Sequence, residues 1–207
     1  MLELIKYRAG YNKNQYLFNE TSFTVSKGEI VGVMGLNGSG KSTFLKGIIN
    51  LIPYKEGKIL INNIDITNLE TNTIFDRFNI GYLSQRNRVF NNLTVSEHLK
   101  LQLHYSCMDS LPETDHFYNF YNIIKQKENL FASSLSGGEQ LVLNLITLMI
   151  KDPEIILLDE PSDSLDIDLK KELSNLLLYW KGNNKAIVLV EQNTELLNNI
   201  SKIIIKI

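Results

Sequence analysis

The chain has 207 residues, which suits one large α/β domain or one domain with an inserted subdomain. Its net charge of -2 gives no general attraction to nucleic acid or membrane surfaces, so we expect no nucleic-acid partner. The single cysteine, Cys107, excludes an internal disulfide and fits a reducing cytosol. The apolar stretch from Leu141 to Ile150 is too short for a bilayer, which needs about 20 residues. Any membrane role would therefore need a separate partner chain.

Two short stretches near the start alternate polar and apolar residues and are expected strands: Leu2 to Lys6, with an imperfect phase, and Thr21 to Val25. Between them, a loop rich in Asn and Gly carries Tyr11. A tyrosine ring there could stack on a nucleotide base, because every base offers a π-face. An ordinary loop tyrosine accounts for the sequence equally well.

A glycine-rich stretch, Gly35 to Thr43, follows an apolar strand expected over Glu29 to Met34. It leads into a helix expected over Thr43 to Asn50, and we call it the glycine-rich loop. Its sequence fits the phosphate-binding pattern G-x-x-x-x-G-K-[ST]. Backbone N–H groups of such a turn, together with the helix N-terminus, bind phosphate oxygens. Lys41 would reach the β/γ-phosphates and the Ser42 hydroxyl would ligate Mg²⁺. The residues expected at the nucleotide are Asn37, Gly38, Ser39, Gly40, Lys41, Ser42 and Thr43.

The next segments are strands expected over Gly57 to Ile61 and Phe78 to Ser84, the second ending at Gln85. From Arg86 to Ser133 the chain has little β character, and helical periodicity covers Leu93 to Leu103 and Thr114 to Leu130. We interpret the aromatic stripe of the second helix as core packing. Without a Cys-x₂-Cys pair, the histidines of this segment are interpreted as structural or surface residues rather than metal ligands: His98, His104 and His116.

The sequence Leu-Ser-Gly-Gly-Glu-Gln at 135–140 opens a long apolar helix that reaches Ile150, with Ser136 placed as its N-cap. This helix N-terminus is either a second anion site or a simple cap. A buried parallel strand over Glu154 to Leu158 then ends in Asp159 and Glu160. In a P-loop protein such an aspartate holds Mg²⁺, and the neighbouring glutamate could act as general base.

The remaining chain continues the alternation of helices and strands. The expected elements are a helix over Asp166 to Lys181, a strand over Ala186 to Val190, a helix over Thr194 to Ile200 and a strand over Lys202 to Ile207.

The hexapeptide at 135–140 resembles the signature motif of ATP-binding cassette (ABC) ATPases. It lies between the P-loop and Asp159-Glu160, in the family's order, and the resemblance covers Leu2 to about Ile205. It implies one ABC ATPase domain over 1–207. That domain would be an α/β P-loop NTPase core with a mixed sheet, an N-terminal antiparallel β subdomain and an inserted helical subdomain. The core would be 1–85 and 134–207, and the helical subdomain 86–133.

The resemblance also implies roles for single residues. Tyr11 would stack on adenine, and Gln85 would touch Mg²⁺ and the attacking water while facing the membrane partner. Asp159 would hold Mg²⁺ and Glu160 would be the catalytic base. Three signature residues would contact the γ-phosphate bound by the other subunit: Ser136, Gly137 and Gly138.

Three features depart from the family pattern. Gln192 stands where the switch histidine is usual; it can hydrogen-bond a γ-phosphate but cannot become cationic. Apolar residues follow the signature where basic ones are usual: Leu141, Val142 and Leu143. With the sequence ending at Ile207, we expect no extra C-terminal regulatory domain of the kind that many importers carry.

Two segments are similar to those of ATPase subunits of branched-chain amino-acid importers. They are the Leu-Val-Glu-Gln-Asn string at 189–193 and the sequence at 92–99.

The resemblance implies a magnesium-dependent ATPase that dimerises, as homodimer or heterodimer, around two ATP molecules. It would drive a separate transmembrane permease from the cytoplasmic face of the cell membrane. One rival is a non-transport ABC ATPase that works with soluble partners, such as an iron–sulfur assembly scaffold. Another is a regulatory ATP-binding module that hydrolyses ATP poorly, an alternative that remains because Gln192 stands where the switch histidine is usual.

Overall fold

The computed structural model describes residues 1–85 and 89–207. They form two compact units. The first comprises Met1–Tyr82, Glu154–Glu160 and Leu178–Ile207, and the second comprises Leu83–Pro153 and Pro161–Leu177. The predicted helical subdomain begins at Arg86, which lies outside the described residues, so its limits stay a prediction.

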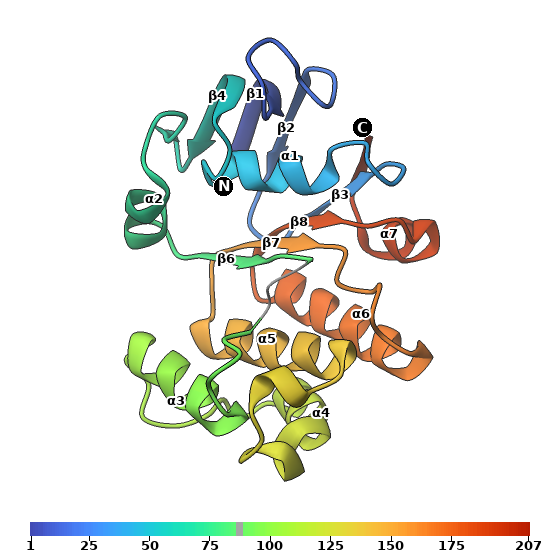
Figure 1. The fold of residues 1–207 in the computed structure, drawn as a ribbon. Coiled ribbons are helices and arrows are strands. Elements are labelled where there is room, and N and C mark those ends of the chain that lie inside the picture. Colours follow the sequence, from blue (N-terminus) through green and yellow to red (C-terminus); the bar gives the residue numbers. More distant parts are fainter. Residues whose placement is uncertain (86–88) are drawn as a thin grey trace. The chain divides into compact units, whose positions relative to one another are not determined.

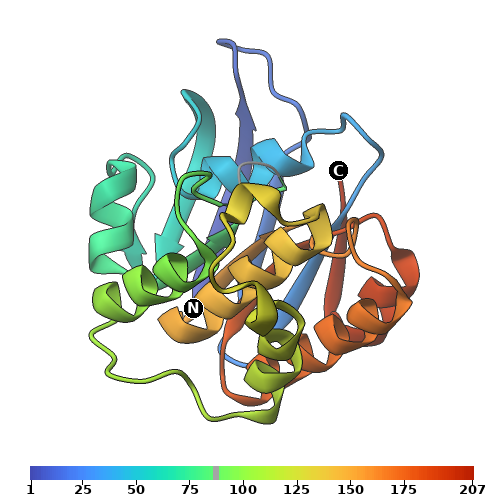
Figure 2. The ribbon, with the colours of Figure 1, turned by 60° about the horizontal axis from the view of Figure 1, so that its bottom comes forward.

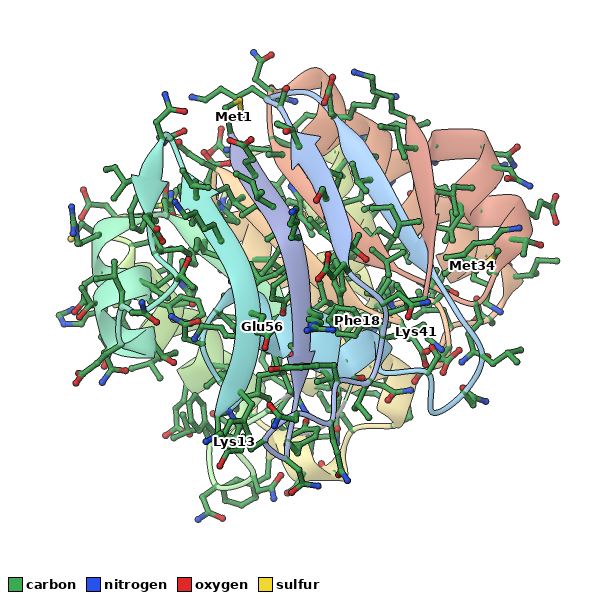
Figure 3. All side chains as sticks on the ribbon, turned by 90° about the horizontal axis from the view of Figure 1, so that it is seen from above. Met1, Lys13, Phe18, Met34, Lys41 and Glu56 are labelled. Carbon is green, nitrogen blue, oxygen red and sulfur yellow. The ribbon has the colours of Figure 1, made fainter. Side chains whose placement is uncertain are left out.

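A four-stranded antiparallel sheet of the first unit has the order β2-β1-β4-β5, and Figure 3 looks onto it. Its strands are β1 (Leu2–Gly10), β2 (Thr21–Val25), β4 (Tyr54–Ile61) and β5 (Ile64–Asp65). The register of β1 shifts against both neighbours around Lys6, whose φ is +47°. This irregularity explains the imperfect phase of the sequence pattern, because an extra residue turns the following side chains to the other face.

The second sheet has five strands in the order β6-β7-β8-β3-β9 (Figure 1). Its strands are β3 (Ile30–Met34), β6 (Ile80–Leu83), β7 (Ile155–Asp159), β8 (Ala186–Val190) and β9 (Ile203–Lys206). The pairs β7–β8, β8–β3 and β3–β9 are all parallel. Every residue of β7 and β8 is buried, as the continuous apolar runs predicted. The carboxyl ends of β7 and β8 therefore lie side by side, where ligands bind in open α/β sheets.

Helix α1 (Lys41–Ile48) contacts both sheets of the first unit, through β1 on one side and β7 and β8 on the other (Figure 1). Phe44, on its buried face, packs its ring 5.4 Å from Tyr7 and 5.2 Å from Phe18. The Tyr7 hydroxyl donates to the Phe44 carbonyl at 2.9 Å. These contacts fix the axis of α1, and so they fix where its N-terminus points.

Two further helices of this unit are α2 (Thr71–Arg77) and α7 (Thr194–Ile200). The sequence pattern predicts neither α2 nor β5. Both are short, and burial of α2 is confined to Ile74, so they give little periodic signal.

The second unit is helical, and α5 (Gly137–Lys151) contacts both α3 (Val95–Tyr105) and α4 (Asp115–Ile124) (Figure 2). The helix predicted over Thr114 to Leu130 is too long: α4 ends at Ile124 and a 3₁₀ turn, Lys125–Lys127, follows. The aromatic stripe is core, since the buried residues of α4 are Phe117, Phe120 and Ile124. Helix α6 (Ile167–Gly182) belongs partly to each unit.

The fold class predicted from the sequence is confirmed. The predicted mixed sheet is resolved into two sheets: the antiparallel pairs belong to the N-terminal sheet, and β3, β7, β8 and β9 pair in parallel. No helix within residues 1–85 and 89–207 combines the length and apolarity that a bilayer crossing requires.

Candidate functional site

The glycine-rich stretch leads directly into α1. The N-cap is Gly40, with φ of +100°, and the helix begins at Lys41, two residues before the predicted start at Thr43. A Cβ on Gly40 would also lie 2.8 Å from the Leu17 Cβ, so only glycine fits both the backbone and the space. The first N–H groups of an α-helix have no intrahelical partners, so the start of α1 offers donors of the kind that an anion site requires.

Lys41 is the first residue of α1 and only 5% exposed. Its Nζ donates to the carbonyl oxygens of Gly35 at 2.8 Å and Leu36 at 3.0 Å, and it pairs with Glu160 Oε1 at 3.0 Å. A buried ammonium needs such partners because burial without them is costly. The Lys41 ammonium is therefore held both by carbonyl groups of the glycine-rich loop and by the carboxylate of Glu160, which follows β7.

Glu160 follows β7 and is 4% exposed, with φ of +48°. Non-glycine residues rarely adopt this left-handed conformation, which costs about 1–3 kcal/mol and persists where surrounding contacts impose it. Here the Glu160 N–H donates to the Val190 carbonyl at 2.9 Å. The carboxylate oxygen Oε1 accepts from Gln192 Nε2 at 3.0 Å as well as pairing with Lys41.

Gln192 links Glu160 to the glycine-rich loop, because its Nε2 also donates to Asn37 Oδ1 at 2.6 Å. Four of the residues that the sequence singled out are thus brought together: Asn37, Lys41, Glu160 and Gln192. We call them the phosphate-end cluster. A phosphate that reached Lys41 would replace Glu160 as its anionic partner, which would leave the carboxylate to accept a proton from water.

Two of the predicted metal ligands, Ser42 and Asp159, come from α1 and β7. Asp159, 1% exposed, ends β7, and Ser42 lies in the first turn of α1, which packs on that strand. In the described part of the chain, no cluster of three or more His, Cys, Asp or Glu could hold a metal by itself. Mg²⁺ takes one or two protein oxygens and completes its shell with substrate phosphates and water, so a serine hydroxyl and an aspartate carboxylate are ligands of suitable chemistry.

Tyr82, in β6, adds a buried hydroxyl that has no hydrogen-bond partner within the described residues. Burial raises the pKa of Tyr82 well above its usual value, and the nearby Asp159 carboxylate and Tyr11 raise it further. The hydroxyl therefore stays protonated and able to donate. An unpartnered donor near Asp159 marks this edge as a place where additional oxygen atoms would be accommodated.

In the second unit, Ser136 caps α5 as predicted. Its Oγ accepts from the Glu139 N–H at 3.3 Å, and the Glu139 carboxylate accepts from the Ser136 N–H at 3.0 Å. These two bonds form a capping box, whereas the sequence analysis predicts only the cap at Ser136. A Cβ on Gly138 would lie 2.8 Å from the Ser164 carbonyl oxygen, so the segment after Glu160 passes too close for a side chain there.

Three other predicted site residues are Tyr11, Gln85 and Thr43. Tyr11 is 50% exposed in the loop between β1 and β2. Gln85, in the second unit, has its Nε2 3.5 Å from Asp163 Oδ2. Thr43 is 5% exposed in α1. The nucleotide, metal and catalytic roles of all these residues stay predictions.

The loop that carries Tyr11 is anchored by contacts that the sequence does not predict. Arg8 Nε donates to Glu56 Oε2 at 2.9 Å, and the Tyr16 hydroxyl donates to Glu56 Oε1 at 2.6 Å. The Arg8 guanidinium carbon lies 4.3 Å from the centre of the Tyr16 ring. This set joins β1, β4 and the loop, and no sequence signal pointed to it because Glu56 is 48 residues from Arg8.

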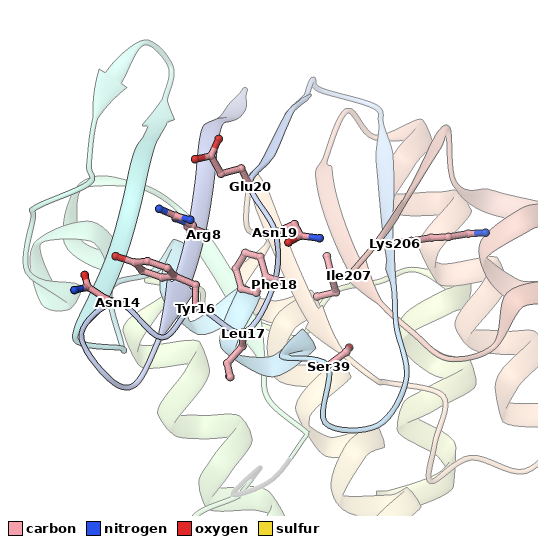
Figure 4. A pocket seen from close by; sticks show the side chains of 10 residues that line it. All are labelled: Arg8, Asn14, Tyr16, Leu17, Phe18, Asn19, Glu20, Ser39, Lys206 and Ile207. Atoms are coloured by element: carbon pink, nitrogen blue, oxygen red, sulfur yellow. The ribbon is translucent and has the colours of Figure 1, made fainter.

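An open pocket of about 630 Å³ adjoins this anchor (Figure 4). It is lined by Arg8, Asn14, Tyr16, Leu17, Phe18, Asn19, Glu20, Ser39, Lys206 and Ile207. Ser39 is the one predicted nucleotide residue among them, so this pocket touches the glycine-rich loop without containing the phosphate-end cluster.

Comparisons with known proteins show which family this chain is similar to. A family model described as ABC transporter matches residues 18–163. The chain is 33% identical over 207 positions to a probable branched-chain amino acid transport ATP-binding protein, LivF, of Archaeoglobus fulgidus, covering 94% of this chain and 83% of that protein. It is 34% identical to the lipopolysaccharide export system ATP-binding protein LptB of Haemophilus influenzae, covering 87% of this chain and 76% of that protein. A dimeric bacterial ABC transporter cassette shares the fold, with a TM-score of 0.81, 24% identity and coverage of 100% of this chain and 94% of that one.

Proposed function

The chain belongs to the ABC transporter family, and from that premise we propose that it is an ATP-hydrolysing subunit that drives a separate membrane subunit. The observation that carries the proposal is the phosphate-end cluster. Lys41, at the N-terminus of a helix that can receive phosphate, is paired at 3.0 Å with the buried carboxylate of Glu160. A cation for phosphate and a base for water in direct contact are the two groups that phosphoryl transfer to water needs.

The nucleotide would lie along the glycine-rich loop. Its phosphates would bind the N–H groups of residues 37–43, and Lys41 would turn from Glu160 to the β/γ-phosphates. Tyr11 would stack on the base, which the anchored loop between β1 and β2 presents. Gln192 would exchange Asn37 for a γ-phosphate oxygen as a neutral donor.

Hydrolysis would then follow from the released carboxylate. Water attacks the γ-phosphorus, the bond from that phosphorus to the bridging oxygen breaks, and Glu160 accepts the water proton. Gln85 would orient the same water. Ser42 and Asp159 are the groups that would hold Mg²⁺, which supplies charge stabilisation at the phosphates.

A second subunit completes the site in this proposal. Ser136, Gly137 and Gly138 would contact the γ-phosphate bound by the other chain, so two chains would close around two ATP molecules, as a homodimer or a heterodimer. Loss of the γ-phosphate removes the group that both helix N-termini share, and the clamp reopens. That cycle would move a transmembrane permease, and the chain would sit on the cytoplasmic face of the membrane through that partner.

The first experiment measures ATP turnover of the purified chain beside Glu160→Gln. We expect turnover to fall by about 10²–10⁴-fold, the usual contribution of a general base, while ATP still binds. Glu154→Gln is the matched control, because Glu154 starts the same strand segment but is exposed and pairs with Lys27 at 3.8 Å. Normal turnover of the Glu160→Gln chain would refute the assigned base.

The second experiment identifies the partner. Glu160→Gln chain is recovered with ATP from detergent-solubilised native cells and its companions are identified by mass spectrometry. A multi-span membrane protein in stoichiometric amount supports the transport role. Recovery of soluble proteins alone would favour an ABC ATPase that acts with soluble partners, with the ATPase chemistry unchanged.

A further inference from the structure

A lysine outside the phosphate-end cluster contacts the helix that would receive the second subunit's ATP. Lys127 Nζ donates to Glu139 Oε1 at 2.5 Å. The other carboxylate oxygen, Oε2, accepts from the Ser136 N–H at 3.0 Å. One carboxylate thus joins the N-cap of α5 to the 3₁₀ turn that follows α4, twelve residues earlier in the chain.

The position of Lys127 is held by its surroundings. Its carbonyl accepts from the Leu130 N–H at 2.9 Å, which closes the turn. The next residue, Glu128, accepts a short hydrogen bond from the Tyr121 hydroxyl of α4. The Lys127 side chain is 38% exposed and that of Glu139 is 22% exposed, so the pair is only partly screened by water.

Glu139 poses an electrostatic problem for the proposed function. The pKa of its carboxyl is held below the usual value, chiefly by the bond from Lys127 and also by the Ser136 N–H, although burial opposes this. Glu139 is therefore an anion in the first turn of α5. An anion there stabilises the helix, but it repels a phosphate that approaches the same N–H groups.

We propose that Lys127 is a positioning residue that neutralises Glu139 and holds it as the cap, so that the α5 N-terminus accepts the γ-phosphate of the ATP bound by a second subunit. The inference rests on the proposed function, because that function brings a phosphate to Ser136 and Gly137. Each carboxylate oxygen of Glu139 has a partner other than the Ser136 hydroxyl: Oε1 accepts from Lys127, and Oε2 from the Ser136 N–H. The Ser136 Oγ itself accepts from the Glu139 N–H, so in this proposal its hydrogen is left to donate to the phosphate. Lys127 acts through Glu139 and does not itself touch the ATP.

The test uses the full chain in the Glu160→Gln background, where ATP is bound but not turned over. Sedimentation velocity measures the ATP concentration that gives half-maximal dimer. Lys127→Gln should raise this concentration by about 3–10-fold, since it uncovers one charge near a helix terminus. Lys127→Arg should stay within about twofold of the parent, because it retains the charge that carries the effect.

Glu139→Gln separates this role from a merely structural one. A glutamine keeps the capping box but carries no charge, so it should dimerise at the same or a lower ATP concentration than the parent. In that background, Lys127→Gln should have no further effect. Lys125→Gln is the matched control, because Lys125 lies in the same 3₁₀ turn with its Nζ 5.9 Å from the Tyr121 ring centre.

Binding of fluorescent ATP to the monomer should be unchanged in all these variants, since Lys127 lies in the other unit from the glycine-rich loop. If Lys127→Gln leaves the ATP requirement of the dimer unchanged, or still raises it when Glu139 is already glutamine, this inference is overturned while the proposed function stands. If the Glu160→Gln chain forms no ATP-dependent dimer at all, the proposed function fails and this inference fails with it.

Discussion

Replacing Glu160 by glutamine tests whether the carboxylate competes with ATP for Lys41. The two side chains are each about 5% exposed and meet at 3.0 Å, so an arriving phosphate must displace a buried anionic partner. A glutamine keeps the shape of the side chain and still offers an oxygen to Lys41. It lacks the charge that holds Lys41 and that repels the phosphate.

The expected size follows from the kind of hydrogen bond that is lost. A bond between charged groups contributes about 1.5–3 kcal/mol and a neutral one about 0.5–1.5 kcal/mol, so the substitution weakens the competitor by about 1 kcal/mol. A tenfold change in affinity corresponds to about 1.4 kcal/mol, so we expect ATP to bind the monomer about 5–10-fold more tightly. The buried Lys41 loses its counter-charge at the same time. We therefore expect the free energy of unfolding without nucleotide to fall by about 1–3 kcal/mol.

Titration with a fluorescent ATP analogue measures the affinity, and urea unfolding without nucleotide measures the stability. Protein is kept dilute enough that sedimentation shows only monomer, because dimer formation would also tighten apparent binding. Glu154→Gln, an exposed change, should alter neither quantity. If Glu160→Gln binds ATP no more tightly and unfolds as the parent does, then Glu160 does not compete for Lys41 and the reasoning is wrong.

Two further predictions concern α5. Gly138→Ala should lower the free energy of unfolding by about 1–3 kcal/mol, because its Cβ would meet the Ser164 carbonyl oxygen at 2.8 Å. Gly137→Ala, whose Cβ would have its nearest atom at 4.0 Å, should leave that free energy unchanged or raise it slightly. Urea unfolding measures both variants, and equal losses of stability would contradict the close approach at Gly138. The pKa of the Glu139 carboxyl is lowered from 4.5 in the folded state, mainly by Lys127. The ionised carboxylate therefore stabilises the fold fully above about pH 4.5, and this contribution is lost as the pH falls through the pKa of the folded state. The stability difference between the parent and Glu139→Gln, measured by urea unfolding from pH 6 to pH 3, should therefore shrink towards the acid end; a difference independent of pH would show that the charge of Glu139 does not matter.

The local patterns of the sequence were sufficient for most elements. The buried strands β7 and β8 and the helix α5 lie within a few residues of their predicted limits, because an unbroken apolar run or a capping serine is a signal within the segment itself. The end of α4 was misjudged by about six residues. Its apolar pattern continues into a 3₁₀ turn, and periodicity alone does not separate the two.

The sequence by itself determined the family and the types of residue present, since the glycine-rich loop, the signature and Asp159-Glu160 are contiguous strings whose spacing is visible without a fold. Only the tertiary structure decided which of these residues meet. Lys41 and Glu160 are far apart in the chain, and they touch because α1 packs on β7 and because Glu160 adopts a left-handed backbone. The contact of Lys127 with Glu139 is likewise decided by tertiary structure, because it depends on how the 3₁₀ turn after α4 lies against the start of α5. Contacts of this kind depend on how elements pack, and packing is decided by the whole core rather than by any single segment.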